Sequence, residues 1–282
     1  RLTADEGDDG ADYWRFQSAA SGNNLNIATY ASGAWVDKVS IDTNGKIGIG
    51  VASPSSFDVD GDDVVISTSG HTGMTINSGS AGSTSRGSIY FAEGTAGDAD
   101  KTRGAIQYQH GTDFMRFITN TVERLRISSA GYVTKPAHPT FCARYSSGEA
   151  NSYSSGDVIK LTLVAGNYLT WDTTSSYSVS TGKFTAPVAG VYYFEGQLMT
   201  TGHSNGDNIQ DIMQLTSSNG LISHPRQRRS YFRSDADANG YFTNSAAGLT
   251  KLSSGDTVWL KAVRTFGVTN TNYCYFTGWL IG

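Results

Sequence analysis

The stretch from Asp235 to Gly240 places oxygen-bearing side chains where a calcium ion could use them. Asp235, Asp237 and Asn239 stand at alternate positions, and Gly240 follows where a calcium loop turns sharply. Hard cations take oxygen ligands at this spacing, although Ala246 replaces the bidentate Glu of the twelfth position. The same residues also suit a metal-free polar hairpin loop, because Asp, Asn and Gly favour tight turns. Calcium is therefore the one cofactor that the sequence suggests, and we expect no other.

A basic cluster before this loop offers a second kind of chemistry. It runs from His224 to Arg233 and contains Arg228, Arg229 and Tyr231. Guanidinium groups form paired hydrogen bonds with carboxylates and phosphates, and neighbouring aromatic rings stack on sugars. This combination suits a surface polysaccharide or a lipopolysaccharide core. The alternative is an exposed strand whose arginines form salt bridges between subunits.

Residue patterns typical of enzymes are absent from the sequence. It contains no Gly-x-Ser-x-Gly nucleophile motif, no metal-spaced set of His or Cys, and no phosphate-binding loop. We therefore expect no catalytic residues, and a binding protein rather than an enzyme.

The composition excludes several classes of partner. Only 16% of residues are charged, against about 25% in typical globular domains. The aromatic content of 11% argues against disorder, and 33 glycines fit many turns. A net charge of −4 gives no broad cationic surface, so we expect no nucleic-acid partner. No apolar run reaches the roughly 18 residues of a membrane span, so we expect no membrane insertion.

The elements that must position these residues are short β-strands. Runs rich in Val, Ile, Thr, Tyr and Phe alternate with clusters of Gly, Asn, Asp and Ser. Two stretches, 36–47 and 122–133, align with an offset of 86 residues, and a short aromatic run precedes each, at 13–16 and 114–117. Each aligned stretch reaches a Gly-containing turn between apolar runs, which predicts a hairpin. Repeats that cannot bury their own faces usually stack or intertwine.

Part of the first half resembles the shafts of bacteriophage tail fibres. The motif NGKIGIG at 44–50, followed by Pro54 and the segment FDV at 57–59, is similar to a repeated shaft module. Further pieces of this kind stand at 86–91 and 123–127. The resemblance implies an intertwined trimeric β stalk.

Three motifs near the C-terminal end resemble the C1q and tumour-necrosis-factor family of trimeric jelly-roll heads. They are GKFTAPVAGVYYF at 182–194, LSSGDTVWL at 252–260 and YFTGWLIG at 275–282. The resemblance implies a jelly-roll β-sandwich and a homotrimer. Residues 191–194 show little alternation, which fits a strand covered on one face by the second sheet and on the other by a neighbouring subunit.

The chain is thus predicted to be all-β, with a trimeric β stalk followed by a jelly-roll head. Pro136 and Pro139 disfavour ladder pairing and predict an extended linker between the two. The predicted domains are a shaft β repeat at 1–51, a shaft β segment at 52–101, a second shaft β repeat at 102–134, a linker at 135–139 and a C1q-like jelly-roll head at 140–282.

The family resemblance also implies where the head binds. In such heads the stalk and the C-terminus lie together at the base, and alternating antiparallel strands then put four segments at the opposite apex: 146–156, 202–207, 233–239 and 266–271. Loops carried on a rigid β scaffold are where binding usually resides. The candidate receptor-binding residues are Tyr153, His203, Asn205, Arg228, Arg229, Tyr231, Arg233, Phe266 and Asn270.

Cys142 and Cys274 are the only cysteines, and both fall in predicted strands of the head. Because the first and last strands are neighbours in the jelly roll that the resemblance implies, a disulfide between them is geometrically possible. Two small, buried, unpaired side chains in a reducing compartment are the other interpretation.

Together the resemblances predict the receptor-binding tip of a phage tail fibre, located in the virion after assembly in the host cytoplasm. Its expected partners are two further copies of itself and a polysaccharide, lipopolysaccharide or outer-membrane protein of the bacterial host. Because the sequence begins at Arg1 rather than Met, we expect a missing N-terminal part that joins other virion tail proteins. The alternatives are a head or baseplate fibre in which the domain only trimerises, a capsule depolymerase with carboxylates paired across subunits, and a secreted bacterial adhesin.

Overall fold

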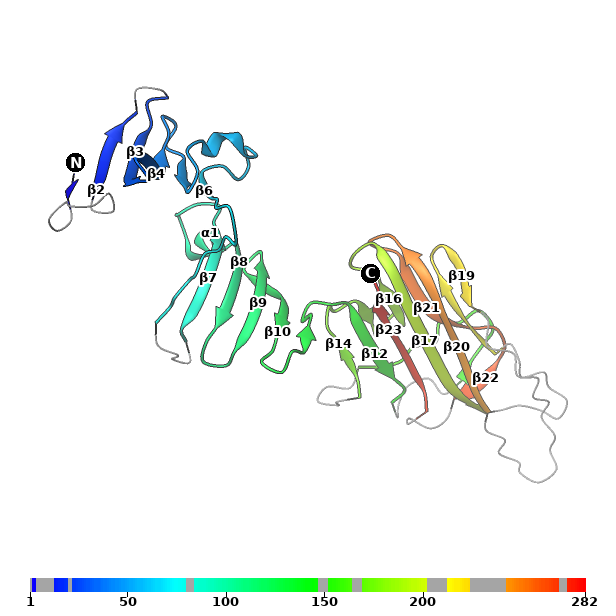
Figure 1. Ribbon diagram of the computed structural model, residues 1–282. Coiled ribbons are helices and arrows are strands. Elements are labelled where there is room, and N and C mark those ends of the chain that lie inside the picture. The colour runs from blue at the N-terminus through cyan, green and yellow to red at the C-terminus, as the bar shows by residue number, and fades with distance from the viewer. Residues whose placement is uncertain are drawn as a thin grey trace. The chain divides into compact units, whose positions relative to one another are not determined.

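A computed structural model of the protein describes residues 2–3, 13–19, 22–79, 84–146, 152–163, 169–201, 212–223, 242–268 and 273–282. The regular structure is almost entirely β (Figure 1), so the predicted all-β class is confirmed. The chain divides into two compact units, Arg1–Gly79 and Ser80–Gly282. Among the described residues, no helix has the length and apolar character needed to cross a bilayer.

The first unit contains one six-stranded sheet, which we call the N-terminal sheet. Its strands pair in sequence order, and every pair is antiparallel except the last, which is parallel. A 3-10 turn, η2 (Pro54–Ser56), precedes the last strand. The strands are β1 (Leu2–Thr3), β2 (Tyr13–Ser18), β3 (Leu25–Ala31), β4 (Ala34–Ile41), β5 (Ile47–Ile49) and β6 (Val64–Ile66).

The second unit begins with a five-stranded antiparallel meander, the meander sheet. A four-residue helix, α1 (Asp98–Lys101), lies in the connection after its first strand. The strands are β7 (Arg86–Phe91), β8 (Gly104–Gln109), β9 (Phe114–Thr119), β10 (Val122–Ile127) and β11 (Val133–Thr134). Sheet pairing therefore divides the first half differently from the predicted segments. The expected segment 52–101 is split, because β6 pairs with β5 whereas β7 pairs with β8.

The two aligned stretches of sequence form equivalent hairpins. The β4–β5 turn places Gly45 at a φ of 82°, and the β10–β11 turn places Gly131 at the same value. In each turn the glycine N–H donates to the carbonyl oxygen three residues earlier, Asp42 at 3.0 Å and Ser128 at 2.9 Å. The aromatic runs upstream are not equivalent, since 13–16 belongs to the second strand before β4 and 114–117 to the strand directly before β10.

Residues 140–282 form a sandwich of two antiparallel sheets. In the seven-stranded sheet the order is β13 (Ser152–Tyr153), β22 (Phe266–Val268), β17 (Gly190–Thr201), β23 (Tyr275–Leu280), β12 (Thr140–Arg144) and β14 (Trp171–Asp172), with β20 (Phe242–Leu252) also paired to β17. In the partner sheet the order is β15 (Tyr177–Ser178), β16 (Lys183–Thr185), β21 (Thr257–Ala262), β18 (Met213–Ser217) and β19 (Gly220–Ser223). This is the jelly-roll sandwich that the sequence predicted.

Aromatic rings from both sheets fill the core of the sandwich. Phe141, Phe184, Phe194 and Phe276 are all completely buried. The ring centroid of Phe141 lies 5.0 Å from that of Phe184 and 4.9 Å from that of Phe276. Gly278 leaves room for this cluster, because a Cβ there would lie 2.3 Å from the Phe194 ring. Rings packed at such distances contribute both apolar burial and favourable edge and stacking contacts.

The two cysteines are buried and unbridged. Cys142 in β12 lies opposite Thr277 of β23, so the first and last long strands are indeed neighbours. The Cys274 thiol instead accepts a hydrogen bond from the backbone N–H of Met199 at 3.2 Å. Burial raises the pKa of the Cys142 thiol, which keeps it protonated and poorly reactive.

Candidate functional site

The first strand of the sandwich begins at one end of the sandwich, and the last strand stops at the same end. We call this end, at which strands start and stop, the proximal edge. The N–H of Leu280 donates to the carbonyl of Pro139 at 3.0 Å, and a ring nitrogen of His138 lies 2.6 Å from the carbonyl oxygen of Leu280. The N–H of Val191 donates to the carbonyl of Gly282 at 2.7 Å. The linker and the end of β23 therefore lie together, as the sequence analysis expected.

The opposite edge of the sandwich, the distal edge, is defined by the other ends of the same strands (Figure 1). Strand β17 starts at the proximal edge, where Gly190 is paired with Leu252, and reaches the distal edge at Thr200. Strand β20 begins at the distal edge, where its first residue lies opposite Thr200. Val268 of β22 pairs with Thr200 at the same edge. The strands that flank segments 202–211 and 224–241 consequently have their described ends toward this edge.

Two of the predicted receptor-binding residues, Tyr153 and Phe266, are buried within the sandwich. Only 5% of Tyr153 and 2% of Phe266 are exposed, and their ring centroids are 5.9 Å apart. The Tyr153 hydroxyl donates to the carbonyl of Lys160 at 3.1 Å. They lie in the paired strands β13 and β22 rather than in apical loops. The prediction that these two residues contact a receptor was wrong, because both rings are buried in the packed core.

The other predicted binding residues lie outside the described part of the chain. This set comprises the receptor candidates His203, Asn205, Arg228, Arg229, Tyr231, Arg233 and Asn270, and the calcium candidates Asp235, Asp237 and Asn239. They stay predictions from sequence. Within the described ranges, no group of three or more His, Cys, Asp or Glu side chains is arranged to hold a metal ion.

The outward face of the seven-stranded sheet carries a polar aromatic cluster that the sequence analysis did not single out. Glu195 accepts hydrogen bonds from the Tyr275 hydroxyl at 2.8 Å and from the Tyr193 hydroxyl at 3.2 Å. The Tyr193 ring packs on Trp279, with centroids 4.6 Å apart. Burial, followed by the hydrogen bond to Glu195, raises the pKa of Tyr275 to about 12. The phenol is therefore a neutral donor to the Glu195 carboxylate at physiological pH.

Apolar side chains surround this cluster on the same face. Leu249 lies opposite Tyr193 and is 61% exposed, and Val191 and Trp171 are exposed as well. Exposed apolar groups gathered on a sheet face, beside a few oriented polar groups, are typical of a protein-interaction surface. Sequence could have found this surface only through residues 191–194, where poor alternation already indicated cover on both faces.

Comparison with known proteins identifies this sandwich. The family model described as the C1q domain matches residues 140–281, just over half of the chain. The chain belongs to the C1q domain family. Among solved structures, the globular domain of the zebrafish complement 1qA protein is similar, with 19% sequence identity and a TM-score of 0.35. That match covers 51% of this chain and 98% of the zebrafish chain.

Membership in the family supplies two general properties of the sandwich. C1q domains are trimerising and ligand-binding modules of a non-enzymatic fold. A module of this kind needs one surface that meets its own copies and another that meets a ligand. The outward face of the seven-stranded sheet and the distal edge are different parts of the C1q domain, so both surfaces can coexist.

Proposed function

We propose that this protein is the receptor-binding tip of a phage tail fibre, a homotrimer that binds a glycan on the bacterial surface without catalysis. The observation that carries the proposal is the shared proximal edge, where Pro139 and Leu280 are hydrogen-bonded. Because the upstream sheets are tethered to that edge, the distal edge is left available for a ligand. Segments 202–211 and 224–241 follow strands directed to the distal edge, and 224–241 contains the arginine and aromatic residues suited to sugars and phosphates.

The trimer is supported by the outward face of the seven-stranded sheet. Leu249 and the Tyr193–Trp279 pair present apolar surface that a second copy of the C1q domain would bury. We expect Leu249→Glu to convert the trimer to monomers, measured by sedimentation velocity on the full chain. Leu221→Glu is the matched control, because Leu221 is 48% exposed on the partner sheet. A Leu249→Glu protein that remains trimeric would place the subunit interface elsewhere.

Receptor binding is tested with the full chain on arrays of bacterial lipopolysaccharides and capsular polysaccharides. We expect Arg228→Ala/Arg229→Ala to abolish the strongest signals while leaving the sedimentation coefficient unchanged. Arg86→Ala/Arg124→Ala removes the same charge from exposed positions of the meander sheet and should bind as wild type. Unchanged binding by Arg228→Ala/Arg229→Ala would contradict the proposal that the basic cluster binds the glycan. A trimer that binds neither glycans nor host cells would favour a purely structural fibre.

A further inference from the structure

The meander sheet has two faces of different chemistry. Cross-strand pairing places Ile89, Ile106, Phe117 and Leu125 in one row across four strands. Because alternate residues point to the same side of a strand, the two flanking rows share this face. Those rows contain Phe91, Gly104, Thr119 and Val122 on one side, and Gly87, Tyr108, Met115, Ile127 and Val133 on the other. We call it the apolar face of the meander sheet. Its three rows contain no charged residue, and the Arg124 guanidinium reaches only its margin, where Nε donates to the Thr119 hydroxyl at 3.3 Å.

The opposite face is a hydrogen-bonded polar ladder. The side-chain amide of Gln107 donates to the Tyr90 hydroxyl at 2.8 Å, and Arg116 donates to the Gln107 carbonyl oxygen at 2.7 Å. Arg126 forms a two-pronged pair with Glu123, both bonds being 2.7 Å. This face has satisfied its polar groups within a single chain, and charged groups of this kind are stable in contact with water.

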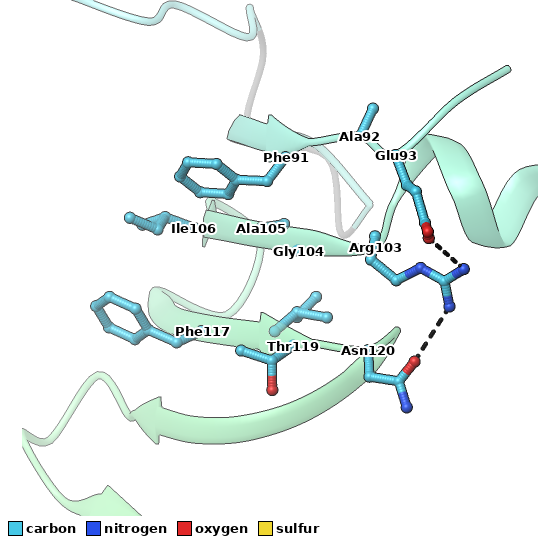
Figure 2. A pocket seen from close by; sticks show the side chains of 11 residues that line it. Phe91, Ala92, Glu93, Arg103, Gly104, Ala105, Ile106, Phe117, Thr119 and Asn120 are labelled. Carbon is cyan, nitrogen blue, oxygen red and sulfur yellow. Dashed lines mark hydrogen bonds and ion pairs between the residues drawn. The ribbon is translucent and has the colours of Figure 1, made fainter. Parts of the chain in front are cut away.

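The apolar face is left open in the single chain. Phe91 and Val133 are each 58% exposed, and Ile89 is 40% exposed. Figure 2 shows Phe91, Ile106 and Phe117 projecting to the same side from three adjacent strands. They border a hollow of about 710 Å³, with the Arg103–Glu93 ion pair at one end. A sheet with one apolar face requires a second layer to bury it.

The N-terminal sheet independently repeats this design. Phe16, Ile27, Val39, Ile49 and Ile66 form one row across its five longer strands. The next row on that face contains Leu25, Ile41, Ile47 and Val64, with Ser18 at its end.

The other face of the N-terminal sheet again carries polar side chains that bond to one another. The Asn26 amide donates to Asp37 at 2.7 Å, and the Ser40 hydroxyl donates to Asn26 at 2.9 Å. On the first face, by contrast, Phe16 is 62% exposed and Val64 is 59% exposed. The same division between an open apolar face and a face with hydrogen-bonded polar side chains therefore occurs in both units.

We propose that these two apolar faces are contacts between copies of this chain, so that three meander sheets pack face to face and three N-terminal sheets do likewise. The inference rests on the trimer of the proposed function. It adds the contacts that the two sheets preceding the C1q domain make within that trimer. A second copy is the occupant that best suits the faces. Their rows are uncharged, with the Arg103–Glu93 ion pair and Arg124 only at the margin of the meander face, so they offer a different partner little charge to complement. The rows also recur at the repeated positions of one sequence.

The short linker supports the same occupant. Six residue steps separate Thr134 from Thr140, the first residue of the C1q domain strands. They span at most about 20 Å, so a trimer of C1q domains would hold three meander sheets at millimolar effective concentration. Every described strand of the meander sheet is paired within its own chain. We therefore infer contacts between complete sheets, whereas the sequence analysis expected intertwined strands.

The test is disulfide cross-linking of single-cysteine positions in the full chain, whose native cysteines are buried. We expect Ile89→Cys to form covalent dimers at least about tenfold faster than Ser88→Cys, because the apolar faces meet at high effective concentration. Phe16→Cys and Gln17→Cys form the equivalent pair in the N-terminal sheet. These substitutions are on the surface of one chain, and circular dichroism of the reduced proteins checks that each variant folds.

The outcomes separate this inference from the proposed function. A wild-type chain that sediments as a monomer would overturn both. A trimer in which Ile89→Cys and Ser88→Cys cross-link at equal rates would overturn only the face-to-face contact. Faster cross-linking at Ser88→Cys would assign the interface to the polar face instead.

Discussion

Lys38 and Arg124 occupy equivalent positions in two β-bulges, one in the N-terminal sheet and one in the meander sheet. Each is the extra residue of its bulge. In each case the residues before and after the bulge pair with consecutive residues of the neighbouring strand. A bulge interrupts the strict two-residue alternation of side chains. Val36 and Val39 are three residues apart, yet they lie on the same face of the N-terminal sheet. The equivalent residues Val122 and Leu125 likewise share one face of the meander sheet. The bulges are thus what makes each apolar face continuous.

Deleting Arg124 should destabilise the meander sheet. Without the extra residue, alternation would force either Val122 or Leu125 onto the polar face. Losing the burial or pairing of one such side chain costs about 1–3 kcal/mol. Urea unfolding of the full chain, followed by protease sensitivity of residues 84–134, measures the change. Arg124→Ala keeps the bulge and serves as the control, so a deletion variant as resistant as Arg124→Ala would contradict this role.

Local sequence patterns were enough to predict the repeat and the sandwich. The hairpin turns required glycine at Gly45 and Gly131, and both adopt the same left-handed φ. The C1q motifs lie in strands whose burial alternates regularly, such as β21, in which every second residue is buried. Signals of this type depend on neighbours in sequence, so a single chain displays them.

The site depended on pairing between distant residues, which sequence alone did not display. Tyr153 and Phe266 are more than a hundred positions apart, and only the pairing of β13 with β22 brings them together in the core. The three-residue strand that contains Phe266 includes Gly267, so its composition resembled a loop. The bulge at Lys38 could not be predicted from sequence either. The register with β3 determines on which face of the sheet each side chain of β4 lies.

Acid should weaken the meander sheet through Glu123. The paired hydrogen bonds from Arg126, reinforced by Arg116, lower the pKa of Glu123. A carboxylate with a lowered pKa contributes stability that is present above its unfolded value, about 4.3, and is lost as pH falls through the folded value. Glu123→Gln should therefore cost about 1 kcal/mol at neutral pH and nothing near pH 2. Denaturant titrations at the two pH values measure this, with the exposed Asp98→Asn as control.

A difference between Glu123→Gln and wild type that persists unchanged in strong acid would contradict the ion-pair explanation. It would indicate that packing around the side chain, and not its charge, stabilises this face. Arg126 would then contribute mainly through its guanidinium, which lies over the Phe114 ring at 4.1 Å.

Gly278→Ala should damage the core of the C1q domain. The added Cβ would lie 2.3 Å from the Phe194 ring and 3.0 Å from the Phe141 ring, and neither ring can retreat within the aromatic cluster. Overpacking of this kind costs about 1–3 kcal/mol. Thermal unfolding of the full chain should show a lowered transition for Gly278→Ala. Gly282→Ala is the control, since a Cβ there meets nothing within 4 Å, and equal transitions for the two variants would contradict the packing argument.

Alkaline pH should destabilise the C1q domain through Tyr275. Because burial and the bond to Glu195 raise the pKa of Tyr275 to about 12, the folded domain favours the neutral phenol. A group whose folded pKa is raised contributes stability that is fully present below its unfolded value, about 10 for tyrosine, and is lost as pH rises through the folded value. Tyr275→Phe should be less stable than wild type below pH about 10, and the difference should shrink toward pH 12.

Denaturant midpoints measured across this pH range provide the test, and Glu195→Gln provides the matched variant. It preserves the size of the acceptor side chain but removes the charge that opposes the phenolate, so it should lower the folded pKa of Tyr275. The alkaline loss of stability should still begin near the unfolded value, about 10, but it should be smaller and end at a lower pH than in wild type. Parallel curves for wild type and Tyr275→Phe between pH about 10 and about 12 would contradict the mechanism. They would mean that neither burial nor the hydrogen bond to Glu195 favours the neutral phenol in the folded domain.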